Sequence, residues 1–333
     1  MPIALKIERP MTMHSRPKVL VTRKLTPAAE ARLRVSYDIW WNQDDRQLSG
    51  DEIIDLAHGM DALLPCVSDN LSASIIKRLP HSIKIISTFS VGYDHINIEA
   101  ASQRAIRVTN TPDVVTNATA DIALLLLLGA ARGAAQGLQS IQSGKWARWS
   151  PTGMLGTDLS GKTLGIFGMG RIGQATAARA RAFGMKIHYH NRTRLSPEKE
   201  GDATFHDTAE SLYAACDIIS LHAASNAETK GIINTAALAH FKPGAMLINT
   251  ARGDLVDDDA LIAALHSGRL SAVGLDVYAN EPNIDPRYRT LQNAFLLPHL
   301  GTATLETRDA MGFRAIDNLD AFFANQPLPD PIN

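Results

Sequence analysis

The sequence predicts an α/β protein that consists of two Rossmann-like, doubly wound parallel-sheet domains. Its 333 residues, 45% of them hydrophobic, are too many for one small core and favour two domains. Apolar runs of strand length alternate with helix-like segments, a pattern typical of parallel sheets with helices on both faces. A glycine-rich loop at 168–173 directly follows one of these runs, which is the context of a dinucleotide-binding fold.

The elements of the first half are short. Thr26-Pro27 opens a helix, because a capping residue is followed there by proline at the first helical position. Residues 1–17 lack the continuous apolar core of a signal peptide, so we expect a loose N-terminal tail. The remaining expected elements are strands at 18–22, 61–65 and 83–87 and a helix at 71–79.

A long helix is expected from about 116 to 143. Its apolar run, 122–131, is about half as long as a bilayer span and apolar almost all round, so we expect it to be buried on every side. The following segment, 144–158, is rich in Trp, Gly, Ser and Pro. It is interpreted as an extended connection whose tryptophans either lie on the surface or contribute to an interface or pocket.

The second half has the more regular pattern. Six apolar runs, most of them separated by helix-like stretches, predict the strands of a complete doubly wound dinucleotide fold. They lie at 163–167, 186–190, 217–221, 246–249, 272–276 and 295–297.

Charge and cysteine content narrow the class of protein. With 33 basic and 34 acidic residues, the chain has no basic excess of the kind that a nucleic-acid interface requires. Cys66 and Cys216 are too few and too far apart for a disulfide framework and are interpreted as buried apolar residues in a reducing compartment. We therefore expect a cytoplasmic protein without a nucleic-acid or membrane partner, and we assign no metal site.

The glycine loop predicts a nicotinamide dinucleotide site. Gly168 permits a tight turn, Gly170 lets the backbone approach a pyrophosphate, and Gly173 lets the helix pack closely on the strand. The helix N-terminus adds amide donors and a partial positive charge. The alternative, a bare packing turn, is disfavoured by the strand before the loop and the Ala-rich helix after it. Arg171 and Ile172 complete the loop.

The end of the next strand predicts which cofactor is used. An NAD site places Asp or Glu about 20 residues beyond the glycines, where it binds the ribose 2′-hydroxyl. Here Asn191 lies 18 residues after Gly173, and no acid is present. Arg192 and Thr193 can instead bind a 2′-phosphate through charge-assisted hydrogen bonds. We expect NADP(H) to be preferred, with NADH as the weaker alternative; the structural alternative is an exposed basic loop.

Three residues of the second half suit hydride transfer to a keto acid. The reaction needs a cation that orients the carboxylate, a proton donor, and a group that keeps the donor protonated. Arg252, His299 and Glu281 each follow an apolar run, and ligands of open α/β sheets bind at the carboxyl ends of strands. Taken singly, they can also be a helix-start charge, a capped loop residue and a turn residue.

The glycine loop and the loops of Arg252, Glu281 and His299 together resemble those of a known family. The chain is similar to the D-isomer-specific 2-hydroxyacid dehydrogenases, in particular the glyoxylate/hydroxypyruvate reductase branch, from about Lys18 to the C-terminus. One departure is Ala223-Ala224-Ser225, where the family usually has a proline-containing turn. The resemblance places this segment near the cofactor riboses, so the departure bears on cofactor affinity and not on the chemistry. The matching stretches are Phe89–His95, Asn117–Asp121, Gly168–Gly173, Leu221–His222, Asn249–Gly253, Gly274–Asp276, Asn280–Pro282 and Pro298–Gly301.

The resemblance implies roles for these residues. Arg252 holds the substrate carboxylate and carbonyl, His299 is the acid/base, and Glu281 tunes it. The amides of Val91 and Gly92 bind the substrate carboxylate from the other domain.

Further residues are assigned to the cofactor and to the pocket walls. The cofactor residues are Thr119, near the phosphate and nicotinamide side, Asp276, which holds the nicotinamide carboxamide, and His222, Thr250, His299 and Gly301. The walls are Leu64 and its neighbours, Val91, the segment near His299, and a tryptophan of the connection, with Trp149 as the candidate and Trp146 in reserve.

The resemblance also implies the domain arrangement. A flavodoxin-like substrate-binding domain, 18–112 and 304–333, is interrupted by the cofactor-binding domain, 113–303. Similar proteins are homodimers that pair through the long helix and the loop after it, about 116–158.

The predicted function is NADPH-dependent reduction of small 2-oxo acids, glyoxylate to glycolate and hydroxypyruvate to D-glycerate. One alternative is a cofactor-sensing binding protein of the same fold, which would more plausibly carry extensions beyond the short tail. A phosphoglycerate-type NAD-dependent dehydrogenase would usually have an acid at Asn191. A formate dehydrogenase is disfavoured because it needs no acid such as Glu281.

Overall fold

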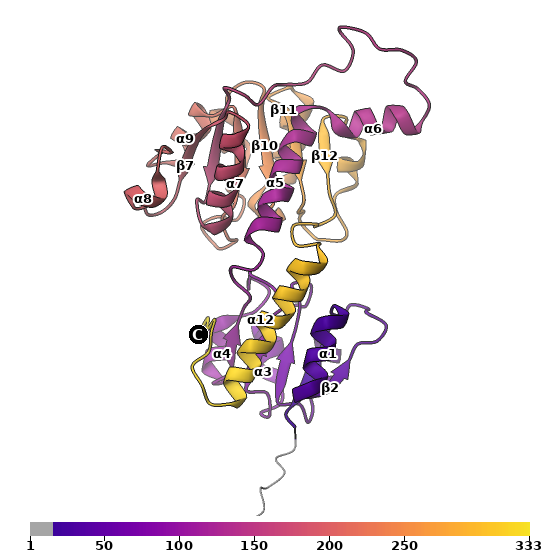
Figure 1. Ribbon diagram of the computed structural model, residues 1–333, viewed down its shortest axis with the longest axis vertical. Coiled ribbons are helices and arrows are strands. Elements are labelled where there is room, and N and C mark those ends of the chain that lie inside the picture. Colours follow the sequence, from indigo (N-terminus) through magenta and orange to yellow (C-terminus); the bar gives the residue numbers. More distant parts are fainter. Residues whose placement is uncertain (1–15) are drawn as a thin grey trace, which may run out of the picture. The chain divides into compact units, whose positions relative to one another are not determined.

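The computed structural model describes residues 16–333, which form two compact units. The first unit comprises the chain up to Pro112 together with Asp309–Asn333, and the second comprises Asp113–Arg308, so the first is built from both ends of the chain (Figure 1). Of the expected N-terminal tail, 1–15 lie outside the described residues. Arg16 is held in place, because its guanidinium donates to the Val35 carbonyl at 2.8 Å.

The first unit contains a five-stranded parallel sheet. Its strand order is β2-β1-β3-β4-β5, the flavodoxin-like order that the resemblance implied. Strands β2 and β5 were not predicted, because their short runs carry little periodicity. The strands are β1 (Lys18–Val21), β2 (Asp38–Trp41), β3 (Ala62–Leu64), β4 (Ile85–Ser87) and β5 (Arg107–Thr109).

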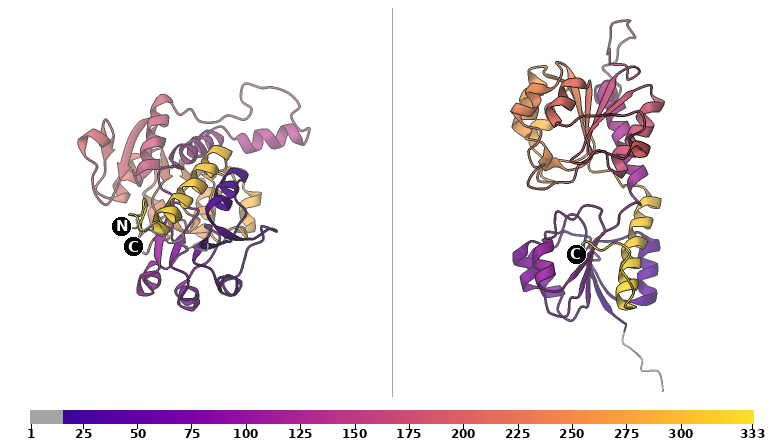
Figure 2. Two further views of the ribbon diagram at one scale, coloured as in Figure 1. Left: turned by 60° about the horizontal axis from the view of Figure 1, so that its bottom comes forward. Right: turned by 90° about the vertical axis from the view of Figure 1, so that its left-hand side faces the viewer.

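Helices cover both faces of this sheet (Figure 2). Helices α2 (Gly50–Leu56), α3 (Ala73–Arg78) and α4 (Ile98–Gln103) share one apolar core with the sheet. Helix α1 (Pro27–Ser36) and the later part of α12 (Leu305–Phe323) share the other core. The sheet is therefore covered on both sides, which explains why its central strands, β1, β3 and β4, are mostly apolar.

The second unit contains a seven-stranded parallel sheet in the order β12-β11-β10-β9-β6-β7-β8. The order of its first six strands along the chain is that of a dinucleotide-binding fold, so the predicted fold class is confirmed. The two-residue strand β8 was not predicted. The strands are β6 (Thr163–Phe167), β7 (Lys186–His190), β8 (Thr204–Phe205), β9 (Ile218–Leu221), β10 (Ala245–Asn249), β11 (Leu270–Leu275) and β12 (Ala294–Leu296).

Two apolar cores lie on the two faces of this sheet. Helices α5 (Thr116–Ala131) and α7 (Arg171–Ala182) pack on one face. On the other face lie α9 (Ala209–Ala215), α10 (Thr235–His240) and α11 (Asp258–His266). Short helical segments lie in the connections: α8 (Pro197–Glu200), η1 (Gly253–Leu255) and η2 (Pro286–Thr290).

The long helix predicted over 116–143 is instead two helices. It breaks after α5 at Gly133, whose φ is +60°, and α6 (Ala134–Gln142) continues at an angle of 70°. No residue of α6 is buried, and α6 and the loop after it extend away from the sheet (Figure 1). The expectation that 122–131 is buried on every side is also wrong for the single chain, since Leu125 is exposed.

Two smaller expectations can be compared with the structure. Cys216 is buried as expected, whereas Cys66 is partly exposed at the end of β3. Within 16–333, no single helix is long and apolar enough to cross a membrane; α5 and α6 meet that test only as a bent pair.

Candidate active site

The glycine loop has a different steric constraint at each glycine. Gly168 has a φ of +96°, and a Cβ there would lie 2.7 Å from the Ala223 nitrogen. At Gly173 a Cβ would lie 2.5 Å from the Gly168 carbonyl oxygen, because α7 packs tightly against the turn. At Gly170, by contrast, a Cβ would meet nothing within 4 Å. The packing of the fold therefore requires glycine at the first and third positions. At the second position, glycine leaves open space at the N-terminus of α7.

These residues fit a dinucleotide. The space at Gly170 lies beside the first amides of a twelve-residue helix, where a pyrophosphate would be stabilised. At the end of β10, the buried Thr250 hydroxyl has no hydrogen-bond partner within the described part of the chain. An unsatisfied buried hydroxyl is unfavourable, and a ligand group at this strand end would satisfy it.

The side chains after β7 differ in their hydrogen bonds and in their exposure. Asn191 Oδ1 accepts a hydrogen bond from the Met169 amide at 2.6 Å, so Asn191 braces the glycine loop. Arg194 is bound by Glu200 through two bonds of 2.7 and 2.8 Å. Arg192 has an 86% exposed side chain, 3.9 Å from Glu228, and Thr193 is exposed.

Two further residues assigned to the cofactor have partners within the second unit. Arg171 forms an ion pair of 2.5 Å with Asp113, in which both side chains are exposed. His222 Nε2 lies 2.8 Å from Ser220 Oγ. Burial lowers the pKa of His222 to about 4, so its ring is neutral at physiological pH.

Arg252, Glu281 and His299 follow the carboxyl ends of β10, β11 and β12. These strands are neighbours in the sheet, so the three loops lie at one edge. The loop of Arg252 is fixed by the buried Asn249, whose side chain accepts from the Ala251 amide and donates to the Arg252 carbonyl.

His299 and Glu281 form the central pair of this edge. His299 Nδ1 lies 2.7 Å from Glu281 Oε2, and Glu281 Oε1 accepts from the Tyr278 amide at 2.7 Å. Burial alone would raise the pKa of Glu281, but the hydrogen bond and charge of His299, the Tyr278 amide and the charge of Arg252 hold it below its usual value. Glu281 is therefore ionised at neutral pH and presents a charged acceptor to Nδ1 of His299.

The turn that carries His299 is held by Asp276 and Thr119. The two carboxylate oxygens of Asp276 accept from the amides of Leu300 and Gly301, at 2.6 and 2.7 Å. The Thr119 hydroxyl donates to the Gly301 carbonyl at 3.2 Å. Burial raises the pKa of Asp276. The predictions assigned Asp276, Thr119 and Gly301 to the cofactor, and they missed that these residues position His299.

In the first unit, the loop after β4 is held by two side-chain hydrogen bonds. The Ser90 hydroxyl donates to the Gly92 carbonyl and the Asn110 side chain donates to the Val91 carbonyl, both at 2.7 Å. The amides of Val91 and Gly92 donate to no acceptor in 16–333. Two neighbouring N–H groups of this kind can bind an anion.

One predicted wall residue must be corrected. The side chain of Leu64 is 0% exposed and belongs to the core shared with α1 and α12, so it cannot line a pocket. Along the same chain segment, Val67 is 38% exposed. The sequence could have indicated the burial of Leu64, because the residues of β3 are all apolar and do not alternate with polar ones, which is typical of a strand that is buried on both faces. Trp146 and Trp149 are both exposed on the loop after α6.

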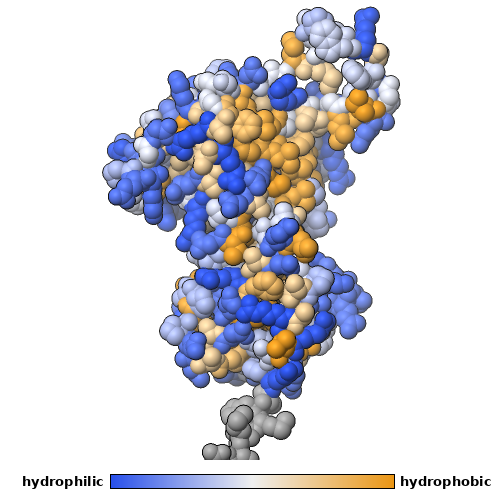
Figure 3. Space-filling model, in the orientation of Figure 1, coloured by the Kyte–Doolittle hydropathy of each residue, from blue (hydrophilic) through white to orange (hydrophobic). Residues whose placement is uncertain are grey.

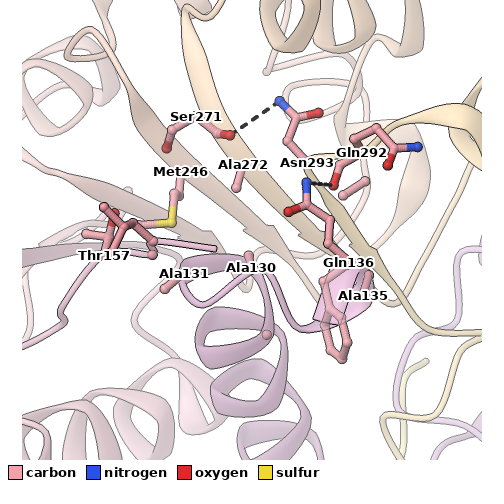
Figure 4. Close-up of a pocket in the computed structure, with 16 residues that line it drawn as sticks. Ala130, Ala131, Ala135, Gln136, Thr157, Met246, Ser271, Ala272, Gln292 and Asn293 are labelled. Atoms are coloured by element: carbon pink, nitrogen blue, oxygen red, sulfur yellow. Dashed lines mark hydrogen bonds between the residues drawn. The ribbon is translucent and has the colours of Figure 1, made fainter. Parts of the chain in front are cut away.

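A cavity of about 210 Å³ lies elsewhere in the second unit (Figure 4). Its walls include Met246 and Ala272, near the amino ends of β10 and β11, and Gln136, which donates to the Gln292 carbonyl at 2.7 Å. None of the predicted site residues lines it. It lies at the opposite edge of the sheet from Arg252, Glu281 and His299, and is therefore not the candidate active site.

Comparisons with known proteins identify the family. Residues 124–301 match the family described as "D-isomer specific 2-hydroxyacid dehydrogenase, NAD binding domain". Glycerate dehydrogenase of Hyphomicrobium methylovorum is 45% identical over 94% of this chain and 98% of its own length.

Solved structures agree over nearly the whole chain. A putative D-isomer specific 2-hydroxyacid dehydrogenase from Polaromonas sp. JS6 66 has a TM-score of 0.90 and 47% identity, covering 96% of this chain and 100% of that one. The NADPH-dependent glyoxylate/hydroxypyruvate reductase of Sinorhizobium meliloti, in complex with NADP and malonate, has a TM-score of 0.85 and 34% identity, covering 96% and 97%. The chain is thus a nicotinamide-dependent oxidoreductase that belongs to the D-isomer-specific 2-hydroxyacid dehydrogenase family.

Proposed function

We propose that the protein reduces small 2-oxo acids with NADPH, converting glyoxylate to glycolate and hydroxypyruvate to D-glycerate. The observation that carries this proposal is the bond of 2.7 Å between His299 and Glu281. Glu281 follows β11, and Arg252 follows the neighbouring strand, β10. This arrangement supplies a proton donor, the carboxylate that keeps it charged, and a cation for the substrate. The names of the Hyphomicrobium and Sinorhizobium relatives fit the same pair of reactions, taken in one direction or the other.

The proposed mechanism assigns one step to each residue. When bound, the reduced nicotinamide supplies the hydride that is added to the carbonyl carbon. The Arg252 guanidinium binds the substrate carboxylate and polarises the carbonyl through paired hydrogen bonds. His299 gives the proton on Nε2 to the developing alkoxide, since its Nδ1 is held by Glu281. Glu281 stays ionised and stabilises the imidazolium until the proton has been transferred.

The proposed cofactor preference rests on Arg192. Its exposed guanidinium follows β7, and the position where an NAD site has its acid is occupied by Asn191, whose oxygen is engaged by Met169. This strand end therefore lacks the carboxylate that would repel a 2′-phosphate. The Sinorhizobium enzyme with NADP bound supports the same choice.

The amides of Val91 and Gly92 remain the proposed anion-binding groups of the first unit. The preference among 2-oxo acids depends on the shape of the substrate pocket. One methylene more or less in a substrate changes the free energy of discrimination by about 1–3 kcal/mol. Trp149 remains the proposed tryptophan of the partner's pocket, with Trp146 as the reserve.

We further propose a homodimer that pairs through α5, α6 and the loop after α6. Large apolar side chains are exposed there, and Figure 3 shows hydrophobic residues gathered over this side of the second unit. A nine-residue helix without a buried residue is not stable by itself in water, so packing against a second copy would account for α6. The exposed side chains are Leu125, Leu138, Ile141, Trp146, Trp149, Met154 and Leu155.

A substrate panel tests the proposed function. Glyoxylate, hydroxypyruvate, pyruvate and a bulky phenyl-substituted 2-oxo acid are each assayed with NADPH and with NADH. We expect the highest kcat/KM for glyoxylate or hydroxypyruvate with NADPH. A higher value for the phenyl acid would overturn the substrate class, and a higher value with NADH would overturn the cofactor preference. No turnover with any of the four acids would overturn the proposed reaction.

A further inference from the structure

A glutamate lies opposite the cation that we assign to the 2′-phosphate. Glu228 Oε2 is 3.9 Å from Arg192 Nη1, and the side chains are 74% and 86% exposed. Arg192 follows β7, whereas Glu228 belongs to the segment after β9. The ion pair therefore joins two different loops of the second unit.

Both loops adjoin the glycine loop. Behind Arg192, Asn191 binds the Met169 amide. In the other loop, the backbone of Ala223 leaves no room for a Cβ at Gly168. The two charges are thus carried by the chain segments that border the proposed dinucleotide site.

The position of Glu228 is set by a rigid turn. Its amide donates to Asn226 Oδ1 at 2.8 Å, and the Thr229 hydroxyl donates to the Ala224 carbonyl at 2.7 Å. Ser225 ties the same loop to Asp254 at 2.7 Å. This last bond lies where the chain departs from the family's proline-containing turn. These bonds fix the backbone of the loop from which the Glu228 side chain reaches Arg192.

The neighbouring cation does not substitute for Arg192. Nε and Nη2 of Arg194 both donate to Glu200, and its Cζ lies over the ring of Phe205, 5.4 Å from the ring centroid. A 2′-phosphate at this strand end would therefore depend on Arg192 and would meet the charge of Glu228 there.

We propose that Glu228 is a specificity-determining residue of the cofactor site. It competes with the 2′-phosphate of NADPH for Arg192 and so limits the preference for NADPH over NADH. This inference rests on the proposed NADPH preference. Since NADH has no phosphate at this position, its affinity depends little on the charge of Glu228.

Cofactor affinities of charge variants test the proposal. Dissociation constants for NADPH and NADH are measured by the fluorescence of the bound reduced cofactor, using the full chain. Glu228→Gln should tighten NADPH binding about two- to fivefold, the range for one exposed ion pair, and should change NADH binding less than twofold. Glu228→Lys should tighten NADPH further. Glu99→Gln, which removes the same charge from an exposed position on α4, should change neither constant.

Two additional measurements separate competition from general repulsion. In the Arg192→Gln background the gain from Glu228→Gln should largely disappear, and in 0.5 M salt it should shrink because exposed charges are screened. If the gain keeps its full size without Arg192, competition for that cation is overturned.

The failures of the two proposals are distinguishable. If Glu228→Gln leaves the NADPH-to-NADH ratio unchanged while Arg192→Gln weakens NADPH alone, this inference is wrong and the NADPH preference stands. If Arg192→Gln weakens both cofactors equally, the proposed preference and the inference are both overturned.

Discussion

His299 Nδ1 lies 2.7 Å from Glu281 Oε2, with both side chains about one-third exposed. One ring nitrogen is thereby committed to the carboxylate and the other is available for a ligand. Because Glu281 is also bound by the Tyr278 amide, its carboxylate has a fixed orientation. The pair can thus hold a proton at a defined position at the carboxyl edge of the sheet.

Replacing His299 tests its role as proton donor. His299→Ala should lower kcat by about 10²–10⁴-fold, because proton donation acts in the transition state, while the dissociation constant for NADPH changes little. Steady-state kinetics and cofactor fluorescence measure the two quantities. His58→Ala, at an exposed position of the first unit, is the control and should behave as the wild type. Unchanged kcat in His299→Ala would remove the residue from the mechanism.

The pH dependence tests the Glu281 carboxylate. Burial raises its pKa, but His299 and the other partners lower it more, so the folded value lies below the unfolded one. A depressed carboxyl pKa gives stability that is present above the unfolded pKa, about 4.3, and is lost as pH falls through the folded value. The stabilising contribution of Glu281 should accordingly be present above about pH 5 and be lost only in stronger acid.

The variant Glu281→Gln removes this charge and keeps an acceptor for Tyr278. The pH–kcat/KM profile of this variant should differ from that of the wild type, because the charged partner of His299 Nδ1 is lost. NADPH affinity at neutral pH should stay unchanged. An identical pH profile would show that Glu281 does not act on the donor.

Two variants distinguish charge from geometry at Arg252. Arg252→Ala should raise KM for glyoxylate and lower kcat together, with kcat/KM reduced on the order of 10²–10³-fold. Arg252→Lys should restore little of this, because a point charge does not make paired hydrogen bonds. Arg289→Ala serves as a control at an exposed position. Full recovery by lysine would mean that charge alone suffices.

The glycine loop provides a matched pair of alanine variants. At Gly170 a Cβ meets nothing within 4 Å and φ is −77°, so Gly170→Ala should fold with unchanged thermal stability and bind NADPH more weakly. At Gly173 a Cβ would lie 2.5 Å from the Gly168 carbonyl, so Gly173→Ala should lower the free energy of unfolding by about 1–3 kcal/mol. Thermal unfolding and fluorescence titration measure both. Equal NADPH affinity in Gly170→Ala and the wild type would contradict a pyrophosphate at this position.

The exposed apolar face of α6 tests the dimer. Glutamates in place of Leu138 and Ile141 should convert the proposed dimer to a monomer in light scattering, because two charges would be buried without partners. Val35→Glu changes an exposed apolar residue of α1 and should leave the mass unaltered. A wild type of monomer mass would overturn the dimer directly.

Local patterns were sufficient to predict much of the second unit. The expected strand at 163–167 and the helix opening at Arg171 coincide with β6 and α7, because apolar strands, turn glycines and helix starts all leave signals within a few residues. Arg252, Glu281 and His299 could be grouped in advance for a topological reason. Parallel strands bring their carboxyl ends to one edge, whatever their separation along the chain.

The missed features depend on contacts between distant segments. The burial of Leu64 depends on α12, some 250 residues later, and the bond between Asn191 and Met169 depends on how two loops meet. The break at Gly133 did have a local signal, a glycine after an apolar helix, which the continuous periodicity concealed. No sequence pattern indicated that Glu228 faces Arg192.

The backbone at His299 has a consequence for the energetics of turnover. Its φ is +54°, a left-handed conformation that costs about 1 kcal/mol for a residue with a side chain, and the contacts of Asp276 and Thr119 maintain it. The imidazole is consequently oriented when the chain folds, before any ligand arrives. In the proposed reaction, the entropy lost in ordering the proton donor therefore belongs to folding, and no further loss is needed in each cycle.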